Sequence, residues 1–505
     1  MKPVDYLLDR ITMYRLLVYY LLALVGCAMV LGAFGRLPYS PMAIAFSAGY
    51  ITVICWLTNK IFAHVFEAPV NVESVYITAL ILSLIITPYK VPHDILFLTA
   101  ASGLAISSKF ILAIRKKHIF NPAAIAVALT AAGAGQAASW WVGTSSLLPF
   151  VVIGGLLIVR KIHRGQMVVS FFGAVFISTI VTSILTHHSV ATSLKTTTLH
   201  SSLFFLAFVM LTEPITSPVT KSLQSWYGVL VGALFPPQIH VLSLYSTPEL
   251  ALVVGNVYAY FVSPKLKLLP RLIKKEVIAP DSIDFIFALD RRIKFRPGQY
   301  MEWTLPHSGA DSRGNRRYFT LASSPTEDTL RLGVKFYPNG SSYKRAMLKM
   351  NGQTTIAAGQ LGGDFTMPKD TSRKLAFIAG GIGVTPYRSM LKYLIDTKEK
   401  RDIVMLYSER AANEIAYRDV FETAMQEIGT RTIYTLTGDT PPPQGWNGKQ
   451  GKISTQMITT EIPDYKQRLF YVSGSHSLVT AVKAMLSELG VEPWQIKTDF
   501  FPGYA

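Results

Sequence analysis

The sequence predicts a multi-domain chain: a polytopic α-helical membrane bundle of about ten helices, then an antiparallel β-barrel, then an α/β domain with a parallel sheet. Apolar stretches of membrane-spanning length recur up to residue 263. After residue 270, apolar and polar residues alternate with period two, and from Lys374 onward apolar strands alternate with helices. The expected domains are residues 1–265, 270–370 and 371–505.

Hydropathy places the helices of the first domain. They are expected near residues 15–34, 42–59, 72–87, 93–114, 119–136, 146–160, 167–187, 199–212, 225–236 and 247–263. Short basic loops follow the fourth, sixth and eighth of them, at Arg115–Lys117, Arg160–Arg164 and Lys221. By the positive-inside rule these loops are cytoplasmic. We therefore expect a multi-pass protein of the cell membrane with both termini in the cytoplasm.

Charge and cysteine content narrow the classes of partner. The chain carries 49 Lys and Arg against 31 Asp and Glu, a net charge of +18. No nucleic-acid module accompanies this charge, so membrane lipid and dinucleotide phosphates are the expected partners, and nucleic acid is not. Cys27 and Cys55 are the two cysteines of the sequence, and both lie in apolar stretches. An iron–sulfur cluster generally needs four thiolates, so neither a cluster nor another metal site is expected.

The second domain is expected from alternating runs at residues 283–287, 300–305 and 330–336, which is typical of a small antiparallel barrel. In the third domain, strands are expected at residues 375–379, 402–407, 431–436, 469–473 and 495–500, with helices at 387–396, 414–428 and 478–489. Repeated βαβ units predict a parallel sheet with a ligand crevice at its carboxyl edge.

A glycine-rich loop, Gly380-Gly-Ile-Gly-Val-Thr-Pro386, follows the first of these strands and opens a helix. Glycines let backbone N–H groups approach a pyrophosphate closely, and a helix N-terminus favours its negative charge. Taken alone, the loop also fits a tight turn that binds nothing.

Five further motifs accompany this loop: residues 296–300, 317–325, 333–335, 340–342 and 471–474. In order and spacing, residues 270 to the end resemble the ferredoxin–NADP reductase superfamily. This resemblance implies an NAD(P)H-dependent oxidoreductase that contains FAD and uses NADH or NADPH.

The resemblance also implies roles for individual residues. Arg317 would pair with the flavin phosphate, Phe319 would cover the isoalloxazine, and the Thr320 hydroxyl would hydrogen-bond flavin N5. Thr320 and Ser473 are the catalytic candidates, Ser473 replacing a family cysteine near the nicotinamide. The other FAD-binding candidates are Tyr300, Val334, Lys335, Ser341 and Ser342. The NAD(P)-binding candidates are Gly380, Gly381, Gly383, Val384, Thr385, Pro386, Ser408, Arg410 and Gly474.

Two open points follow from the same resemblance. Ser408 and Arg410, placed after the second parallel strand, could meet a 2′-phosphate. Asp499 stands at the place of the family's acidic residue near the C-terminus, and Tyr504 is a candidate to shield the flavin.

Polar clusters interrupt the apolar half at Ser107–Phe110, Lys117–Ala123 and Thr212–Pro218, where capped helix ends and ligand contacts both fit the pattern.

Residues 70–262 resemble the RnfD membrane protein of the Rnf electron-transport complex and the homologous NqrB protein of the sodium-translocating NADH:quinone reductase, most specifically in Lys-His-Ile-Phe-Asn-Pro122. That resemblance implies a second flavin, FMN, in the membrane domain. Its candidate residues are Lys109, Asn121, Ser202, Thr212, Glu213 and Thr216. The family's flavin-bearing threonine falls near Leu203, which leaves Ser201 or Ser202 as the attachment point, or non-covalent binding.

The combined expectation is a membrane-bound flavoprotein oxidoreductase that passes electrons from NAD(P)H through FAD to a membrane flavin and then to quinone or another acceptor. Other membrane electron-transport subunits are candidate partners. One alternative is a heme-containing ferric reductase or NADPH oxidase, which needs pairs of mid-helix histidines. Another is a flavin or ion transporter with a reductase domain, in which Glu213 and Lys109 would line the pathway.

Overall fold

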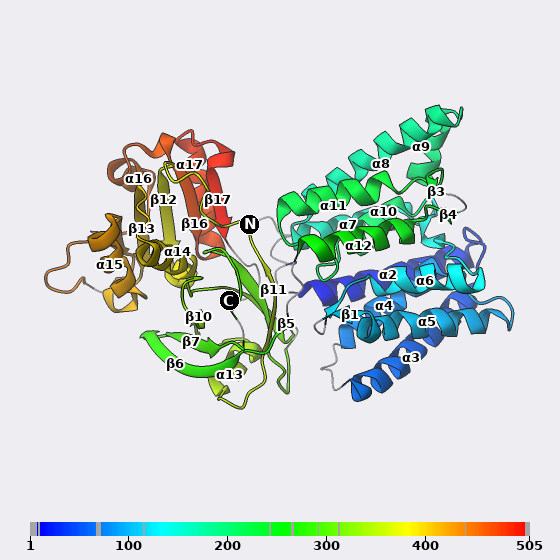
Figure 1. The fold of residues 1–505 in the computed structure, drawn as a ribbon, viewed down its shortest axis with the longest axis horizontal. Coiled ribbons are helices and arrows are strands. Elements are labelled where there is room, and N and C mark those ends of the chain that lie inside the picture. The colour runs from blue at the N-terminus through cyan, green and yellow to red at the C-terminus, as the bar shows by residue number, and fades with distance from the viewer. Residues whose placement is uncertain are drawn as a thin grey trace. The chain divides into compact units, whose positions relative to one another are not determined.

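The chain folds as two compact units, residues 1–266 and 267–505, and Figure 1 shows the elements of each. The structure is a computed structural model that describes residues 8, 11–66, 72–114, 117–241, 244–263, 267–290, 292–311, 314–439 and 441–499. Arg115, Lys116 and Tyr504 lie outside these described residues.

The first unit is helical. Its longer helices are α2 (Met13–Ala33), α3 (Pro41–Val65), α4 (Val72–Ile85), α5 (Asp94–Ile111), α6 (Pro122–Ala134), α7 (Leu148–Ile162), α8 (Gly165–Leu185), α9 (Val190–Leu199), α11 (Lys221–Ala233) and α12 (Pro248–Val262). Helix α9 occupies a stretch in which the sequence predicts none. Its polar composition, with four threonines and a lysine in ten residues, gives no apolar window.

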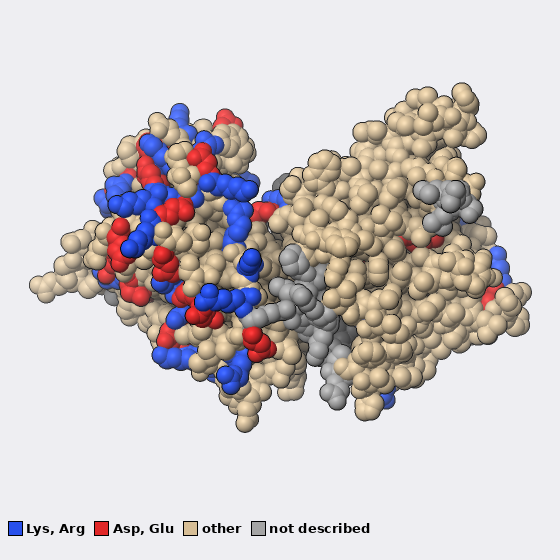
Figure 2. Space-filling model, viewed as in Figure 1, with Lys and Arg blue, Asp and Glu red and all other residues tan. Residues whose placement is uncertain are grey.

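Among the described residues, four helices, α2, α3, α5 and α8, are long and apolar enough to cross a membrane. In Figure 2 the visible face of this unit is almost free of Lys, Arg, Asp and Glu, whereas charged side chains crowd the second unit. An uncharged outer surface is what contact with lipid requires, because a charged side chain is costly to bury in hydrocarbon.

Helix starts in this unit follow local capping chemistry. The hydroxyl of Thr12 accepts from the Arg15 backbone N–H, Ser40 caps α3 before Pro41, and Asn121 caps α6 before Pro122. Each cap satisfies a backbone donor that the helix itself leaves open, and proline at the first turn loses no hydrogen bond.

The continuous helix expected over 199–212 is wrong in detail. The structure divides it into the end of α9, the short α10 (Leu203–Phe205) and a π-helical turn, η2 (Leu206–Met210). A π-helical turn widens the backbone spiral locally and often marks a functional segment. Here it is followed, after Leu211, by Thr212 and Glu213.

The second unit begins with two antiparallel sheets. One contains β6 (Arg271–Ala279), β7 (Ser282–Ala288) and β10 (Leu330–Lys335), and the other contains β5 (Lys267–Leu268), β8 (Tyr300–Thr304), β9 (Arg316–Thr320) and β11 (Ala357–Gly362). The antiparallel pairing agrees with the period-two pattern, but the described strands form two sheets instead of one continuous barrel. Helix α13 (Ser342–Lys349) packs on them through Tyr343 and Met347.

The rest of the second unit is a doubly wound parallel sheet in the order β15-β14-β13-β12-β16-β17. Its strands are β12 (Leu375–Gly380), β13 (Ile403–Glu409), β14 (Arg431–Leu436), β15 (Lys449–Gln450), β16 (Leu469–Ser473) and β17 (Ile496–Asp499). Helices α14 (Thr385–Thr397) and α15 (Arg418–Ile428) share a core with one face, and α16 (Thr455–Glu461) and α17 (His476–Glu488) with the other (Figure 1). Successive strand residues therefore enter opposite cores, as the near-continuous apolar runs require.

Candidate functional site

The glycine loop lies between β12 and α14, at the carboxyl edge of the parallel sheet. Gly381 has a φ of +59°, a conformation that residues with a Cβ rarely adopt. A Cβ on Gly383 would stand 2.5 Å from the Cα of Gly474, at the end of the neighbouring strand β16. The loop and Gly474 thus meet backbone to backbone, with no room for a Cβ at Gly383. Such a tight turn at the start of a helix forms a cradle that suits a dinucleotide phosphate.

Three other candidate loop residues serve the fold. Val384 is buried in the core that α14 and α15 share with the sheet. Thr385 and Pro386 begin α14 and are also buried. These three residues anchor the loop in the core, Gly380 packs against the Leu478 side chain, and Gly381 and Gly383 supply the backbone of the turn.

Thr320, Ser473 and Asp499 converge beside this loop. The Thr320 hydroxyl, at the end of β9, donates a hydrogen bond of 2.9 Å to Asp499 Oδ2, at the end of β17. Asp499 is in register with Ser473, the last residue of β16. The catalytic candidates of the antiparallel and parallel parts therefore meet through Asp499.

The Asp499 carboxyl is held in an apolar setting. Burial raises the pKa of Asp499 to about 7, although the Thr320 hydroxyl opposes this shift. A carboxyl group that titrates near neutrality can hold or release a proton under ordinary conditions.

Strand β9 separates its candidate residues by face, because side chains alternate along a strand. Arg317 lies over the ring of Tyr343, 4.9 Å from its centroid, and the Phe319 ring lies 6.1 Å from that of Tyr343. Thr320 points to the other face, where Tyr300 is its register partner across β8. The strand thus brings Arg317 and Phe319 together on one side and Thr320 and Tyr300 on the other.

An anion-binding corner surrounds Arg317. Arg317 is 2% exposed, and its guanidinium lies 3.9 Å from the carboxylate of Asp311. Asp311 also accepts a 2.9 Å hydrogen bond from the Ser342 N–H at the start of α13, where Ser341 is the N-cap. A carboxylate held between an arginine and a helix N-terminus shows that this corner favours negative charge, so the residues present fit a flavin phosphate.

Val334 and Lys335 end β10 and lie on opposite faces of it. Val334 is buried in the core beneath the antiparallel sheets. Lys335 forms an ion pair of 2.7 Å with Glu414 and lies 3.8 Å from Glu409. Both acidic partners follow from the tertiary structure, and the sequence alone does not reveal them.

Ser408 and Arg410 were expected to follow the second parallel strand, but β13 continues through Glu409. Ser408 is buried and pairs in register with Gly380, whereas Arg410 is exposed. Ser408 therefore lies beside the glycine loop as expected, and Arg410 lies beyond the sheet edge.

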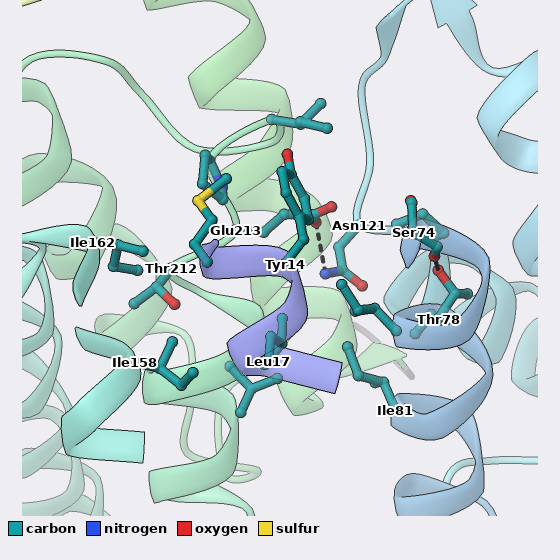
Figure 3. A pocket seen from close by; sticks show the side chains of 17 residues that line it. Tyr14, Leu17, Ser74, Thr78, Ile81, Asn121, Ile158, Ile162, Thr212 and Glu213 are labelled. Carbon is teal, nitrogen blue, oxygen red and sulfur yellow. Dashed lines mark hydrogen bonds between the residues drawn. The ribbon is translucent and has the colours of Figure 1, made fainter. Parts of the chain in front are cut away.

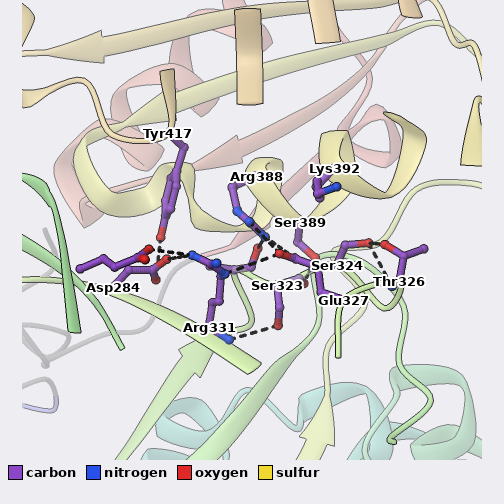
Figure 4. A network of polar contacts seen from close by, with 12 residues as sticks. Asp284, Ser323, Ser324, Thr326, Glu327, Arg331, Arg388, Ser389, Lys392 and Tyr417 are labelled. Atoms are coloured by element: carbon purple, nitrogen blue, oxygen red, sulfur yellow. Dashed lines mark hydrogen bonds and ion pairs between the residues drawn. The ribbon is translucent and has the colours of Figure 1, made fainter. Parts of the chain in front are cut away.

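A buried polar network joins the antiparallel part to the parallel part, and Figure 4 shows it. Arg388 of α14 donates to the carbonyl of Ala322 at 2.9 Å and forms an ion pair with Glu327. In the same network Tyr417 donates to Asp284 of β7 at 3.1 Å. Sequence reasoning missed this network, although Arg388 stands only two residues beyond the glycine-loop motif.

The helical unit contains a pocket of about 660 Å³, its open mouth included. Mainly apolar side chains of α2, α4, α7 and η2 line it, among them Leu17, Ile81 and Ile158. Figure 3 shows Asn121, Glu213 and Tyr14 at one end and Ser74 with Thr78 at one side. A pocket that is mostly apolar with a few polar groups at one end is the common form of a small-molecule site.

Several residues expected at a membrane flavin do meet here. Asn121 donates to Glu213 at 2.8 Å, and Thr216 donates to the same carboxylate oxygen at 2.9 Å. Lys109 donates to the hydroxyl and carbonyl of Ser74, which lines the pocket. Thr212 also lines it. Asn121 additionally caps α6, so the capping role and a place in the pocket coexist.

Ser202 is the exception among these candidates. It is buried just before α10 and does not line the pocket, whose residues of the same stretch begin at Val209. The structure therefore separates Ser202 from the cluster around Glu213.

The histidines relevant to a heme lie at helix ends or outside the helices. His64 lies in the last turn of α3, His93 and His163 cap α5 and α7, and His200 caps α9. His187 and His188 follow α8, and His118 and His240 lie in two-residue strands. Within the described ranges, these positions provide no facing pair at mid-helix depth.

Protein-family models match three segments of the chain. Residues 130–260 match the NQR2, RnfD, RnfE family, residues 270–360 an oxidoreductase FAD-binding domain, and residues 377–484 an oxidoreductase NAD-binding domain.

Individual proteins resemble part of the chain. A glycine betaine monooxygenase reductase subunit of Pseudomonas aeruginosa is 27% identical over 215 residues, 41% of this chain and 57% of the relative. A flavohemoprotein of Bacillus cereus is 27% identical over 217 residues, 41% of this chain and 53% of the relative. The chain thus spans about half the length of these curated relatives. Among solved structures, an Amycolatopsis cytochrome P450 reductase is 22% identical, with 47% of this chain and 70% of that chain covered and a TM-score of 0.42.

The three matched segments follow one another in a single chain, and they fall within the second half of the helical unit, the antiparallel sheets and the parallel sheet, respectively. The protein is a fusion of a membrane domain of the NQR2, RnfD, RnfE family with FAD-binding and NAD-binding oxidoreductase domains.

Proposed function

We propose that this protein is a membrane-bound flavoprotein oxidoreductase that passes electrons from NAD(P)H through FAD to a membrane flavin and then to quinone or another acceptor. The observation that carries the proposal is the contact between Thr320 and Asp499, beside Ser473 and the glycine loop. It joins the FAD-binding and NAD-binding domains at the place where their ligands must meet.

The chain's own residues hold and orient the reactants. Bound FAD supplies an acceptor that takes an electron pair and releases electrons singly. Arg317 and the start of α13 attract the flavin phosphate, and Gly381 and Gly383 expose backbone to the nucleotide phosphates. The Thr320 Oγ1 proton points at Asp499 Oδ2, so this pair can hold a proton at the reaction site.

The pocket of the helical unit is the proposed place of the membrane flavin. Asn121, Thr212 and Glu213 line it, and Lys109 and Thr216 bond to its lining residues. Its apolar walls fit a ring system, and its polar end fits the hydrogen-bonding edge of one. Because Ser202 lies outside the pocket, non-covalent binding is the simpler arrangement.

We further propose that the protein crosses the membrane several times with the reductase domains and both termini in the cytoplasm. Arg160 and Lys161 end α7, Arg164 precedes α8, and Lys221 begins α11. Such clustering of basic residues at particular helix ends is typical of the cytoplasmic side. Other electron-transport subunits are candidate partners there.

Cofactor analysis of the detergent-purified protein tests this function. We expect one FAD and one FMN per chain, a flavin absorption spectrum, and bleaching of that spectrum by NADH or NADPH. A Soret band would instead favour the heme-containing alternative. If the protein oxidised neither nucleotide after flavin was added back, the proposed function would be wrong.

Glu213→Gln separates the two halves of the electron route. We expect reduction of FAD by the nucleotide to stay within about twofold of the native rate, because Glu213 belongs to the helical unit. Quinone reduction should fall about tenfold or more, because the change removes the charge at the polar end of the pocket. Stopped-flow flavin absorbance and quinone absorbance measure the two steps.

Glu249→Gln is the matched control for this experiment. Glu249 is also buried in the helical unit, where it accepts from the Trp140 indole at 2.8 Å, but it does not line the pocket. It should leave quinone reduction near the native rate. Equal losses of quinone reduction in both variants would show that the pocket is not part of the electron route. Ion uptake without quinone reduction would favour a transporter.

A further inference from the structure

An acidic pair lies at the carboxyl end of β13. Glu409 is the last residue of that strand, and its side chain is 5% exposed. Its Oε1 accepts from the Tyr407 hydroxyl at 3.2 Å, and its Oε2 lies 3.8 Å from the ammonium of Lys335. Glu414, in the turn η4 (Ala412–Glu414), takes the closer contact with Lys335, at 2.7 Å. Two carboxylates therefore share one lysine.

Glu409 borders the nucleotide cradle directly. The nearest atom to a Cβ placed on Gly381 is Glu409 Oε1, at 4.0 Å. The residue before it, Ser408, pairs in register with Gly380. In parallel sheets of this kind, an acidic side chain near the glycine loop and the end of the second strand can accept a hydrogen bond from a ribose 2′-hydroxyl.

The same position is unfavourable for a 2′-phosphate. A phosphate brought there would meet two carboxylates, and Lys335 is already engaged by both. Repulsion between like charges is strong in a partly buried site, where water screens it poorly. Arg410 follows the strand in a bend and is exposed to solvent, where water and salt screen its charge more than that of the buried Glu409.

We propose that Glu409 makes this protein selective for NADH over NADPH, by accepting a hydrogen bond from an adenosine ribose hydroxyl and repelling a 2′-phosphate. This inference rests on the proposed function and names the nucleotide that serves it. Glu414 assists by holding Lys335 away from an incoming phosphate.

Stopped-flow reduction of the FAD in the full-length, detergent-purified protein measures this selectivity. We expect the native protein to favour NADH in kcat/KM by about tenfold or more, since like-charge contacts oppose the wrong ligand. Glu409→Gln keeps the side-chain size and removes the charge, so the NADH to NADPH ratio should shrink several-fold, chiefly through better use of NADPH. Glu422→Gln makes the same change on α15, where Glu422 pairs with Arg418 at the surface, and should leave the ratio unchanged.

The dependence on pH provides a readout that a merely structural role would not give. Burial raises the pKa of Glu409 to about 7, with Lys335 opposing and Glu414 assisting the shift. Tyr407 also faces the carboxylate. Below that pH the group loses its charge, so the native preference for NADH should weaken as pH falls from about 8 to about 6. Glu409→Gln should lack this part of the pH dependence.

The outcomes are distinguishable. A native protein that uses NADPH as well as NADH overturns the inference without any variant, and leaves the proposed function intact. An unchanged ratio in Glu409→Gln overturns it as well. Failure of both nucleotides to reduce the flavin would refute the proposed function itself, and the inference with it.

Discussion

Replacing Thr320 with valine is expected to slow reduction of the FAD by nucleotide about 100-fold, because groups that position or hold a proton at a reaction site typically contribute such factors. Valine has nearly the shape of threonine but cannot donate a hydrogen bond to Asp499. Among the described residues, the Thr320 hydroxyl is the side-chain hydrogen-bond donor to Asp499. Nucleotide affinity should change little, since the glycine loop is untouched. Rapid-mixing absorbance measures the rate, and titration measures the affinity.

Thr320→Ser is the matched control, because it keeps the hydroxyl and should retain most of the rate. If the valine and serine variants were slowed equally, packing of the methyl group would explain the loss, and the hydroxyl would have no role. Equal rates in the valine variant and the native protein would contradict the proposed site.

Asp499 adds a pH signature to the same test. Its folded pKa of about 7 lies above its ordinary value, so folding favours the protonated form. The stability linked to this group is therefore present at low pH and lost as pH rises through about 7. The Asp499→Asn variant should lack that loss, which denaturant unfolding at several pH values can measure.

Arg388→Met is expected to lower the free energy of unfolding of the second unit by roughly 3 kcal/mol, because removing one partner of a buried ion pair leaves the other charge uncompensated. The side chains of Arg388 and Glu327 are 6% and 14% exposed. Glu327 keeps a weaker contact with Arg331 at 3.5 Å, which limits the loss. Denaturant unfolding followed by flavin fluorescence measures the change.

The variant should also slow reduction of the FAD. Arg388 follows the glycine loop in α14, and it bonds to the carbonyl of Ala322, two residues beyond Thr320. Losing that contact loosens the alignment of the FAD-binding and NAD-binding domains. Small displacements of the reacting groups slow a reaction strongly.

Two comparisons keep this prediction falsifiable. Arg418→Met breaks an exposed pair with Glu422, with side chains 53% and 44% exposed, and should cost at most about 0.5 kcal/mol. Glu327→Gln combined with Arg388→Met should recover part of the loss, since no unpaired carboxylate remains. Similar losses for Arg388 and Arg418 would show that the buried network contributes no special stability.

Much of the architecture follows from the sequence alone. Apolar stretches predict the helices of the first unit, period-two alternation predicts antiparallel strands, and the glycine loop predicts the first βα turn of a parallel sheet. These signals are local, because each depends on residues a few positions apart. Local patterns do not predict every element. The polar α9 has no apolar window, and the π-helical turn before Thr212 depends on packing and not on periodicity.

The sequence by itself thus determined the kinds of domain and their order, and it supplied the candidate residues for the chemistry. Only the tertiary structure decided which of these residues meet. Thr320 and Asp499 lie 179 positions apart, and Lys335 reaches Glu409 and Glu414 from a different sheet. The structure also brought Asn121 to Glu213 and kept Ser202 away from them. The physical reason is that such contacts arise from the packing of distant segments against one another, and no pattern of neighbouring residues encodes that packing.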